Sequence, residues 1–311
     1  MEEIDLVYLW VDGSDPQWRA KHDALTASGT AFRDADCKGR YADSGELKFS
    51  LRSVEKYAPW IHRIFIVTDN QIPSWLDISN PRIRIVDHTD IMPAECLPCF
   101  NSVIIEHHLH NIPGLSEKFI YANDDMLLNR PVTPSSFFAE DGLPIMRLNR
   151  RICRKFTLFL KEKVIHRPPS IYLKTIRNSA GLIEARYGTY YGWKTHHNMD
   201  AYLKSTYAYA RELFRAEIDA TLQNHERSDK DIQRNLYNYV AVAEGKAHLK
   251  YVTSRTSFRF HIEKAGHYAK LARYNPTFFC MNDSQYCNDN DRRRAAEFLA
   301  SKFPDKSKFE K

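Results

Sequence analysis

Two adjacent carboxylates, Asp124 and Asp125, follow the apolar run Lys118–Ala122, which is typical of a buried strand. Asn123 precedes the pair directly. In proteins, Mg²⁺ and Mn²⁺ are held by one or two carboxylates together with phosphate oxygens of the substrate. The pair therefore predicts a divalent-cation site for a phosphate-bearing substrate such as a nucleotide-sugar diphosphate. The alternative interpretation is a solvated turn, because Asn and Asp are common turn residues.

Two further apolar runs end in acidic residues. Ile4–Val11 is followed by Asp12 and Asp15, and Phe278–Met281 is followed by Asn282-Asp283. Because ligands of parallel sheets bind at the carboxyl ends of the strands, we expect the carboxylates after the strands to gather at one sheet edge. The Asn-Asp pair could add oxygen ligands to the cation.

Other residues could take part in group transfer. Glu106 lies four residues after Ser102 and therefore on the same helix face, although such pairs are common on solvated faces. One of the adjacent histidines His196 and His197 could be a general base, because an unperturbed pKa of about 6.5 suits removal of a hydroxyl proton. The alternative interpretation is a structural role. Arg227 stands at the start of a predicted helix, where a surface ion pair of small value is the simple interpretation.

Two metal-like patterns are incomplete. The three histidines between residues 107 and 110 share a predicted helix with Glu106, but their spacing is not H-E-x-x-H. Cys96 and Cys99 have the spacing of half a zinc or redox site, and no second CxxC or His pair completes it. With six cysteines and no dense disulfide framework, we expect free thiols.

The elements that must position these residues alternate between strands and helices in the first half of the chain. Strands separated by helices favour an α/β fold with a mostly parallel sheet. The apolar spacing over residues 200–244 predicts an accessory helical layer. The predicted elements are strands at 4–11, 63–68, 82–86, 118–122 and 278–281, and helices at 46–58, 101–112 and 291–303.

The chain is mildly basic, and its charge is unevenly distributed. It has 45 Lys and Arg against 39 Asp and Glu, a net charge of +6. This excess is too small to indicate nucleic acid, but it is compatible with a phosphate-bearing substrate or an anionic membrane surface. Between residues 147 and 167, eight basic residues stand against one acid, Glu162. The eight are Arg147, Arg150, Arg151, Arg154, Lys155, Lys161, Lys163 and Arg167.

The start of the chain does not resemble a signal peptide, since Glu2 and Glu3 are acidic and Asp5 interrupts the first apolar run. No run approaches the roughly 20 apolar residues that a transmembrane helix needs. We therefore expect a cytoplasmic protein. The basic segment 147–167 would allow peripheral association with the inner face of the cell membrane.

Four blocks occur in order along the chain. The first is IDLVYLWVDGSDPQW at residues 4–18, and the second, residues 46–138, contains ELKFSLRSVEKYAPWIHRIFIVTDNQIPSWL and FNSVIIEHHLHNIPGLSEKFIYANDDMLL. The third covers about residues 196–242, and the fourth is FFCMNDSQYCNDND with FPDKSKFE downstream. Together they resemble the Stealth proteins. This family of sugar-1-phosphate transferases includes bacterial capsular-polysaccharide phosphotransferases and the animal N-acetylglucosamine-1-phosphotransferase that marks lysosomal enzymes.

The resemblance implies transfer of a hexose 1-phosphate, by default N-acetylglucosamine 1-phosphate, from a UDP-sugar to a sugar hydroxyl, with UMP as the leaving product. It also implies a nucleotide-sugar transferase fold of the GT-A-like type and dependence on Mg²⁺ or Mn²⁺. The catalytic residues of the family fall on Ser102, Glu106, Asp125, His197 and Arg227, and its metal ligands on Asp124, Asp125, Asn282 and Asp283. We further predict donor contacts from Asp12, Asp15, Asn123 and Arg52.

Two departures from the family pattern bear on the site. Met199 stands where the family often has a proline, so His196 remains an alternative to His197. Cys99 stands near a position where the family commonly has a threonine, which further weakens a CxxC metal site. The general base is either His197 or Glu106; we favour His197, with Glu106 as the residue that orients it or a ligand.

We expect one catalytic domain over residues 1–311. It would consist of an α/β nucleotide-sugar-binding part (1–145), a variable basic insertion (146–195), a helical part (196–250) and a C-terminal part that completes the active site (251–311). The expected partners are a UDP-sugar and an oligo- or polysaccharide acceptor, without nucleic acid. The alternatives are a metal-dependent glycosyltransferase, which would release UDP, and a non-catalytic polysaccharide- or membrane-binding protein.

Overall fold

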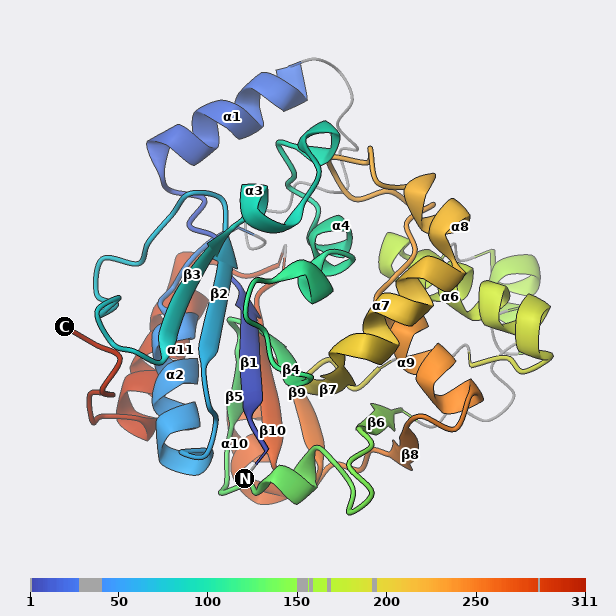
Figure 1. Cartoon of the computed structure of the whole chain (residues 1–311). Coiled ribbons are helices and arrows are strands. Elements are labelled where there is room, and N and C mark those ends of the chain that lie inside the picture. Colours follow the sequence, from blue (N-terminus) through green and yellow to red (C-terminus); the bar gives the residue numbers. More distant parts are fainter. Residues whose placement is uncertain are drawn as a thin grey trace.

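A five-stranded sheet runs through the part of the chain that the computed structural model describes (Figure 1). The strand order is β3-β2-β1-β4-β7. The first four strands are parallel, and β7 pairs antiparallel with the edge of β4. These strands are β1 (Ile4–Leu9), β2 (Ile64–Thr68), β3 (Ile83–Asp87), β4 (Lys118–Asn123) and β7 (Asp200–Leu203).

The structure describes residues 2–27, 41–149, 156, 159–166, 169–191, 195–284 and 286–311. Several residues of the predicted basic segment lie outside these ranges, as do two of the cysteines. They are Arg150, Arg151, Arg154, Lys155, Arg167, Cys37 and Cys153. The four cysteines within the described ranges are free thiols.

The four parallel strands confirm the strands predicted from the first half of the sequence. Their inner members are buried on both faces, which is why β1 and β2 appear in the sequence as nearly continuous apolar runs. The prediction was wrong at β7, which we expected to open a helical stretch. Residues 200–203 pair with β4, more than 70 positions earlier in the chain, and the ring of Tyr202 stacks on Phe119 with 5.4 Å between centroids. Long-range pairing thus overrides the local pattern.

Helix α2 (Glu46–Tyr57) covers one face of the sheet, as its apolar spacing predicts. Leu47, Leu51 and Val54 are buried and belong to the same apolar cluster as Ile4 and Ile64. The cluster anchors α2 so that its first residue, Glu46, lies close to the ends of the strands.

The helix predicted at residues 101–112 is broken in the structure. It forms α4 (Ser102–Glu106), followed by a separate 3₁₀ turn at Leu109–Asn111. The Glu106 carbonyl accepts a hydrogen bond from the Tyr207 hydroxyl (2.6 Å), so it is engaged by a distant side chain and not by the next helical turn. The break lets the buried Glu106 side chain face the carboxyl ends of the strands.

A three-stranded sheet, β5-β10-β9 among the described residues, adds the C-terminal part of the chain. Strand β10 pairs antiparallel with β5 and parallel with β9. The Met281 amide donates to the Asp125 carbonyl (2.9 Å), which holds the end of β10 beside the acid pair. The elements are β5 (Met126–Leu128), β9 (Ser257–His261), β10 (Phe278–Asn282), α10 (Ala265–Tyr274) and α11 (Asp289–Lys302).

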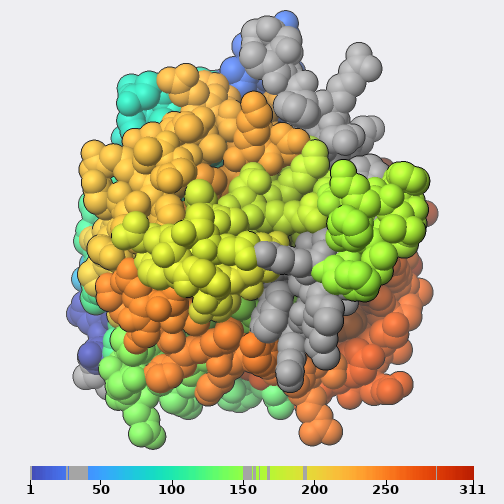
Figure 2. Space-filling model, turned by 90° about the vertical axis from the view of Figure 1, so that its right-hand side faces the viewer, coloured from blue at the N-terminus to red at the C-terminus, as the bar shows by residue number. Residues whose placement is uncertain are grey.

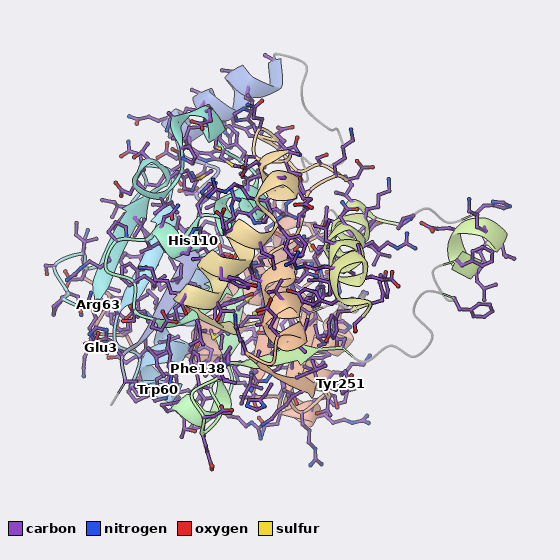
Figure 3. The ribbon with its side chains drawn as sticks, turned by 45° about the vertical axis from the view of Figure 1, so that its right-hand side comes forward. Glu3, Trp60, Arg63, His110, Phe138 and Tyr251 are labelled. Carbon is purple, nitrogen blue, oxygen red and sulfur yellow. The ribbon has the colours of Figure 1, made fainter. Side chains whose placement is uncertain are left out.

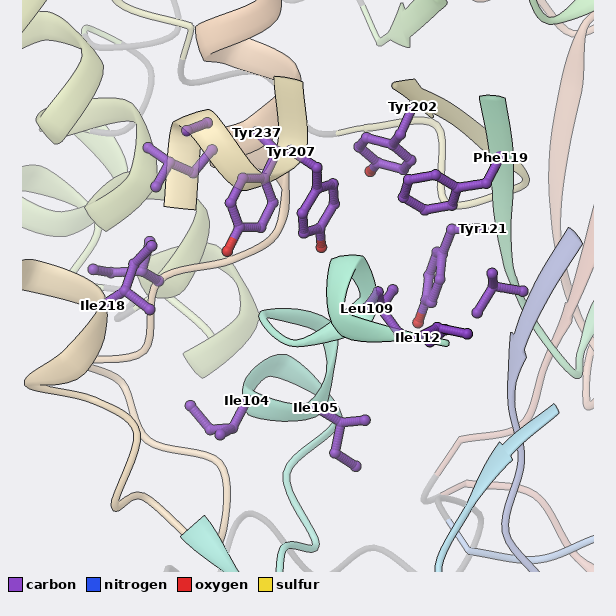
Figure 4. Close-up of a cluster of buried hydrophobic side chains, with 14 of the residues drawn as sticks. Ile104, Ile105, Leu109, Ile112, Phe119, Tyr121, Tyr202, Tyr207, Ile218 and Tyr237 are labelled. Carbon is purple, nitrogen blue, oxygen red and sulfur yellow. The ribbon is translucent and has the colours of Figure 1, made fainter. Parts of the chain in front are cut away.

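A helical layer packs against the other side of the five-stranded sheet (Figure 1). Its core is rich in tyrosine, with Tyr207 and Tyr237 stacked at 3.8 Å between centroids (Figure 4). Helix α6 lies across the surface of the layer (Figure 2). The helices are α6 (Ile171–Tyr187), α7 (Lys204–Leu213), α8 (Arg215–Asp219) and α9 (Asn235–Ala243).

The remaining elements are short, apart from helix α1. They are α1 (Pro16–Ala27), α3 (His88–Ile91), β6 (Ile145–Leu148), β8 (His248–Tyr251), the 3₁₀ turns Ala94–Cys96 and Pro134–Ser136, and the π-helical turn Leu160–Val164. Strands β6 and β8 pair with each other in parallel. Among the described residues, no helix combines the length and apolar composition that a membrane crossing requires. The domain boundaries expected from the sequence stay predictions.

Candidate active site

A cavity of about 610 Å³ opens where the carboxyl ends of β4 and β10 meet the helical layer. It gathers most of the residues that the sequence singled out, although they come from five separate segments. Those that line it are Ser102, Glu106, Asn123, Asp124, Asp125, His197, Arg227, Asn282 and Asp283. The carboxylates that follow β4 and β10 thus line one cavity, although the two strands belong to different sheets.

Three predicted donor contacts do not line this cavity or its neighbour in the described structure. Asp12 accepts hydrogen bonds from the backbone and side chain of Ser14, within its own loop. Asp15 accepts from the backbone N–H groups of Gln17 and Trp18 at the start of α1. The hydrogen bonds of Asp12 and Asp15 therefore stabilise the loop between β1 and α1.

Arg52 is the third of these residues, and it points to the other side of α2. Its Nε and Nη2 donate to the two carboxylate oxygens of Glu310 at 2.8 and 2.7 Å, and its Nη1 donates to the Phe303 carbonyl at 2.7 Å. These bonds fasten the C-terminal segment to α2. Arg52 therefore contributes to the fold and has no contact with the cavity.

The acid pair Asp124-Asp125 combines a carboxylate oxygen that lacks a hydrogen-bond partner in the described structure with repulsion between neighbouring carboxylates, and both features suit a bound cation. Asp125 Oδ1 is buried and has no hydrogen-bond partner among the described residues, while its Oδ2 accepts from the Cys280 thiol at 3.0 Å. Burial and the neighbouring Asp125 raise the pKa of Asp124 far above its usual range. Burial also raises the pKa of Glu46 to about 7, with Asp43 and Asp125 acting in the same direction. A divalent cation would relieve this repulsion, so the donor set fits Mg²⁺ or Mn²⁺.

The sequence did not single out Glu46 or Asp43. Both are separated from the acid pair by about 80 positions in the chain. Both lie in a polar stretch that by itself gives no indication of a functional site. The sequence did contain one signal for Glu46, because this residue is the first of an amphipathic helix whose apolar face is buried. Such a residue must lie at the edge of the sheet that the helix covers.

The fourth-block residues are held by arginines. Asn282 Oδ1 accepts from the Arg259 guanidinium, with 3.2 Å from Nε. The carboxylate of Asp283 accepts from Arg292 Nε at 2.7 Å. Both residues line the cavity, but the Asp283 charge is already paired. Arg259, which the sequence did not single out, is exposed and brings a positive charge to the cavity wall.

Glu106 belongs to a buried polar network. Its Oε1 lies 2.8 Å from the Tyr121 hydroxyl, and its Oε2, which has no hydrogen-bond partner among the described residues, lies 3.5 Å from Arg234 Nε. Arg234 is buried and donates to Asp200 Oδ2 (2.7 Å) and to the Tyr202 hydroxyl (2.6 Å). Burial raises the pKa of Glu106, while the Arg234 charge opposes this shift.

The two adjacent histidines have different surroundings. His196 is buried, and its Nε2 lies 2.9 Å from Asp200 Oδ1. Burial alone would raise the pKa of Asp200, but His196 and Arg234 hold it at about 2. His197 instead lines the cavity, and burial together with the charge of Arg259 lowers its pKa to about 3. Its imidazole is therefore neutral, with a free electron pair at one ring nitrogen.

Arg227 and Ser102 form a joint hydrogen-bonding unit. Arg227 Nη2 donates to Ser102 Oγ at 2.7 Å, and Arg227 Nε is buried without a partner among the described residues. Both residues line the large cavity and a smaller one beside it. An unpartnered guanidinium N–H at such a junction is suited to an anionic group.

The smaller cavity, about 140 Å³, is mainly aromatic and aliphatic. Trp18 lies 4.9 Å from Tyr41 and 5.1 Å from Phe100 between ring centroids. The remaining walls come from the end of β1, and from Val67, Asp69, His88, Cys99 and Ile105. The two cavities share Ser102, Asn123, Asp124 and Arg227. The sequence motifs did not indicate these three aromatic residues, because they lie in separate segments of the chain that only folding brings together.

Comparisons with known proteins identify the family of the chain. The Stealth conserved region 1 matches residues 2–29, and Stealth conserved region 2 matches residues 40–146. The exopolysaccharide phosphotransferase cps2G of Lactiplantibacillus plantarum is 33% identical over 99% of this chain and 96% of its own length. The capsular polysaccharide phosphotransferase WcwK of Streptococcus pneumoniae is 32% identical over the whole of both chains.

Among solved structures, the galactosyltransferase LgtC in complex with donor and acceptor sugar analogues is similar in fold. The TM-score is 0.50 with 14% sequence identity, and the match covers 97% of this chain and 96% of LgtC. The predicted GT-A-like α/β fold is thereby confirmed. With full-length relatives above 30% identity, the chain belongs to the Stealth family and is a phosphotransferase enzyme.

Proposed function

We propose that this enzyme transfers a sugar 1-phosphate from a UDP-sugar to a saccharide hydroxyl in capsular or exopolysaccharide synthesis, and releases UMP. The names of its full-length relatives support the polysaccharide acceptor. N-acetylglucosamine 1-phosphate is the first candidate for the transferred group, on the family resemblance alone.

The observation that carries the proposal is the pair of adjoining cavities with opposite character. The small cavity offers aromatic rings to a planar base, and the large one offers carboxylates, arginines and a neutral imidazole. Arg227 and Asp124 line both. A nucleoside diphosphate sugar has this layout, with an apolar ring at one end, two phosphates in the middle and a hydroxylated sugar at the other.

Mg²⁺ or Mn²⁺ would be held by Asp125 with Asp124, and when bound it would neutralise charge on the donor phosphates. Arg227 and Ser102 would donate hydrogen bonds to oxygens of the phosphoryl group that is transferred. Such donors act most strongly where charge develops during the reaction. Asp283 is paired with Arg292, so we assign it to the wall of the site and give it no direct role in the transfer.

His197 would accept the proton of the acceptor hydroxyl. The acceptor oxygen forms a bond to the β-phosphorus, the bond from that phosphorus to the bridging oxygen breaks, and UMP leaves with the electron pair. The low pKa of His197 arises from burial and from the positive charges of Arg259, Arg234 and Arg227. An anionic donor offsets those charges, so we infer that donor binding raises the basicity of His197. Glu106 would orient the side chains that surround it in the site.

The product nucleotide tests the proposal directly. The purified protein would be incubated with Mg²⁺, a panel of UDP-hexoses and a short capsular oligosaccharide. We expect UMP by chromatography and a phosphodiester resonance by ³¹P NMR. Release of UDP with a new glycosidic bond would identify a glycosyltransferase and overturn the proposal. Binding of the oligosaccharide without turnover of any UDP-hexose would favour a non-catalytic polysaccharide-binding protein.

A further inference from the structure

A second set of ligand atoms lies at the cavity floor. The Asp125 carboxylate, a ring nitrogen of His197 and the Cys280 thiol all lie within 4.8 Å of one another. They come from three separate places in the chain: the turn after β4, the segment before β7, and β10. Cys280 is completely buried, whereas Asp125 and His197 line the cavity.

The composition of this set differs from that of a magnesium site. Mg²⁺ prefers oxygen ligands, whereas thiolate and imidazole ligands select Zn²⁺ and similar ions. Zinc–sulfur bonds are about 2.3 Å and zinc–nitrogen bonds about 2.0 Å long, so tetrahedral ligands lie about 3.5 Å apart. The Cys280 sulfur lies 3.0 Å from Asp125 Oδ2, and the three ligand atoms all lie within 4.8 Å of one another.

Zinc binding requires the thiolate form of Cys280 and an unprotonated ring nitrogen of His197. At present the Cys280 S–H donates a hydrogen bond to Asp125. On binding, the S–H bond breaks, the proton leaves to solvent, and a sulfur–metal bond forms. A zinc ion held by these three ligands would keep its fourth position for an exchangeable ligand.

We propose that Asp125, His197 and Cys280 form a zinc-binding site, and that Zn²⁺ bound there inhibits phosphotransfer. The inhibition rests on the proposed function, because it follows from the use of Asp125 and His197 by the transfer reaction. The binding itself does not depend on it. Zinc would displace the cation held by oxygen ligands and occupy the electron pair that accepts the acceptor proton.

Cobalt substitution and a matched pair of cysteine variants test the binding. We expect Co²⁺ to produce a thiolate-to-metal charge-transfer band, with one ion per chain in calorimetry. Cys280→Ser should abolish the band and weaken Zn²⁺ binding at least tenfold, whereas Cys287→Ser should change neither. Cys287 is a suitable control because it is a free thiol of the same region that does not belong to the triad. A band that persists in Cys280→Ser would overturn the proposal.

X-ray absorption at the zinc edge of the wild-type protein gives a test that does not depend on a variant folding. One sulfur at about 2.3 Å is expected, and a shell of oxygen and nitrogen alone would refute the site. Inhibition is measured with Mg²⁺ present: micromolar Zn²⁺ should reduce UMP release, and Cys280→Ser should be less sensitive. Zinc binding without inhibition would overturn the inhibitory role. Absence of UMP release at any Zn²⁺ concentration would instead count against the proposed function, and the spectroscopic result would still decide the site.

Discussion

The guanidinium of Arg234 lies 3.5 Å from the carboxylate of Glu106, and both side chains are buried. The same guanidinium pairs with Asp200 and lies over the ring of Tyr121, 4.3 Å from its centroid. A single cation thus compensates two buried carboxylates, one on β7 at the edge of the five-stranded sheet and one in the wall of the cavity. Arg234 connects the stability of the fold to the orientation of Glu106.

Arg234→Met should destabilise the protein strongly. Removing one partner of a buried ion pair leaves uncompensated charge, which typically costs about 3–5 kcal/mol. The free energy of unfolding would be measured in urea. Arg215→Met is the matched control, because Arg215 and its partner Glu212 are both more than 60% exposed and such pairs contribute about 0–1 kcal/mol. Equal effects of the two substitutions would contradict the role of Arg234.

Arg227→Ala and Asp125→Ala should each lower kcat for UMP release by about 100-fold or more, with the fold retained. Loss of one group that stabilises developing charge typically costs about 10²–10³ in rate. Circular dichroism would confirm the fold. Arg293→Ala is the control, since Arg293 is exposed on α11, where its Nη2 donates to Asn290 Oδ1 of the same helix at 2.8 Å. Near-normal turnover in either site variant would remove that residue from the mechanism.

Trp18→Ala should raise the KM for the UDP-sugar about tenfold and leave kcat nearly unchanged. Stacking of an aromatic side chain on a base contributes about 1–3 kcal/mol. Trp60→Phe serves as the control, because Trp60 donates to the Val132 carbonyl and does not line the small cavity. If Trp18→Ala lowers kcat without affecting KM, the small cavity is not the base-binding site.

Glu46 should make the stability of the metal-free protein depend on pH. Its pKa rises from 4.5 to about 7 on folding, so the folded state binds the proton more tightly than the unfolded state. The free energy of unfolding should therefore fall as pH rises from about 4.5 to about 7, by at most about 3 kcal/mol. Glu46→Gln should flatten this slope.

Two controls accompany this pH series. Glu55→Gln changes a partly exposed carboxyl of the same helix and should preserve the slope. Saturating Mg²⁺ should reduce it, because a cation near the acid pair favours the ionised form of Glu46. A slope that is the same in wild type and Glu46→Gln would show that another group causes it.

The basic segment carries exposed apolar side chains, which favours the membrane association expected from its charge. Phe156, Phe159, Val164 and Ile165 are each more than half exposed. The Leu160–Val164 turn projects from the side of the molecule (Figure 3) and is tied to α6 by a Glu162–Arg177 ion pair. Apolar side chains next to basic residues are suited to the interface of an anionic bilayer.

Vesicle flotation tests this surface. Vesicles that contain phosphatidylglycerol should bind the protein in a salt-sensitive way, and Phe159→Ser with Ile165→Ser should lower binding severalfold. Ile72→Ser with Ile78→Ser is the control, because these isoleucines are exposed to a similar extent elsewhere. Equal losses in both double variants, or no binding to anionic vesicles, would refute the membrane surface.

Much of the strand framework could be read from the sequence. Apolar runs such as Ile64–Thr68 are local patterns, and so is the placement of Asp124-Asp125 directly after a strand. The helix at residues 101–112 and the segment 200–203 were mispredicted, because the hydroxyl of Tyr207 and the edge of β4 act on them from distant positions. Local periodicity contains no information about such partners.

By itself, the sequence determined which residue types follow the strands, because each of these motifs is a contiguous stretch of the chain. Those residue types in turn indicated the kind of reaction that the site could support. Tertiary structure alone decided that Arg52 turns away to Glu310 while Arg234, Glu46 and Cys280 join the cavity region. The physical reason is that burial, pairing and repulsion depend on distances between side chains. Those distances arise only when segments far apart in the chain pack together.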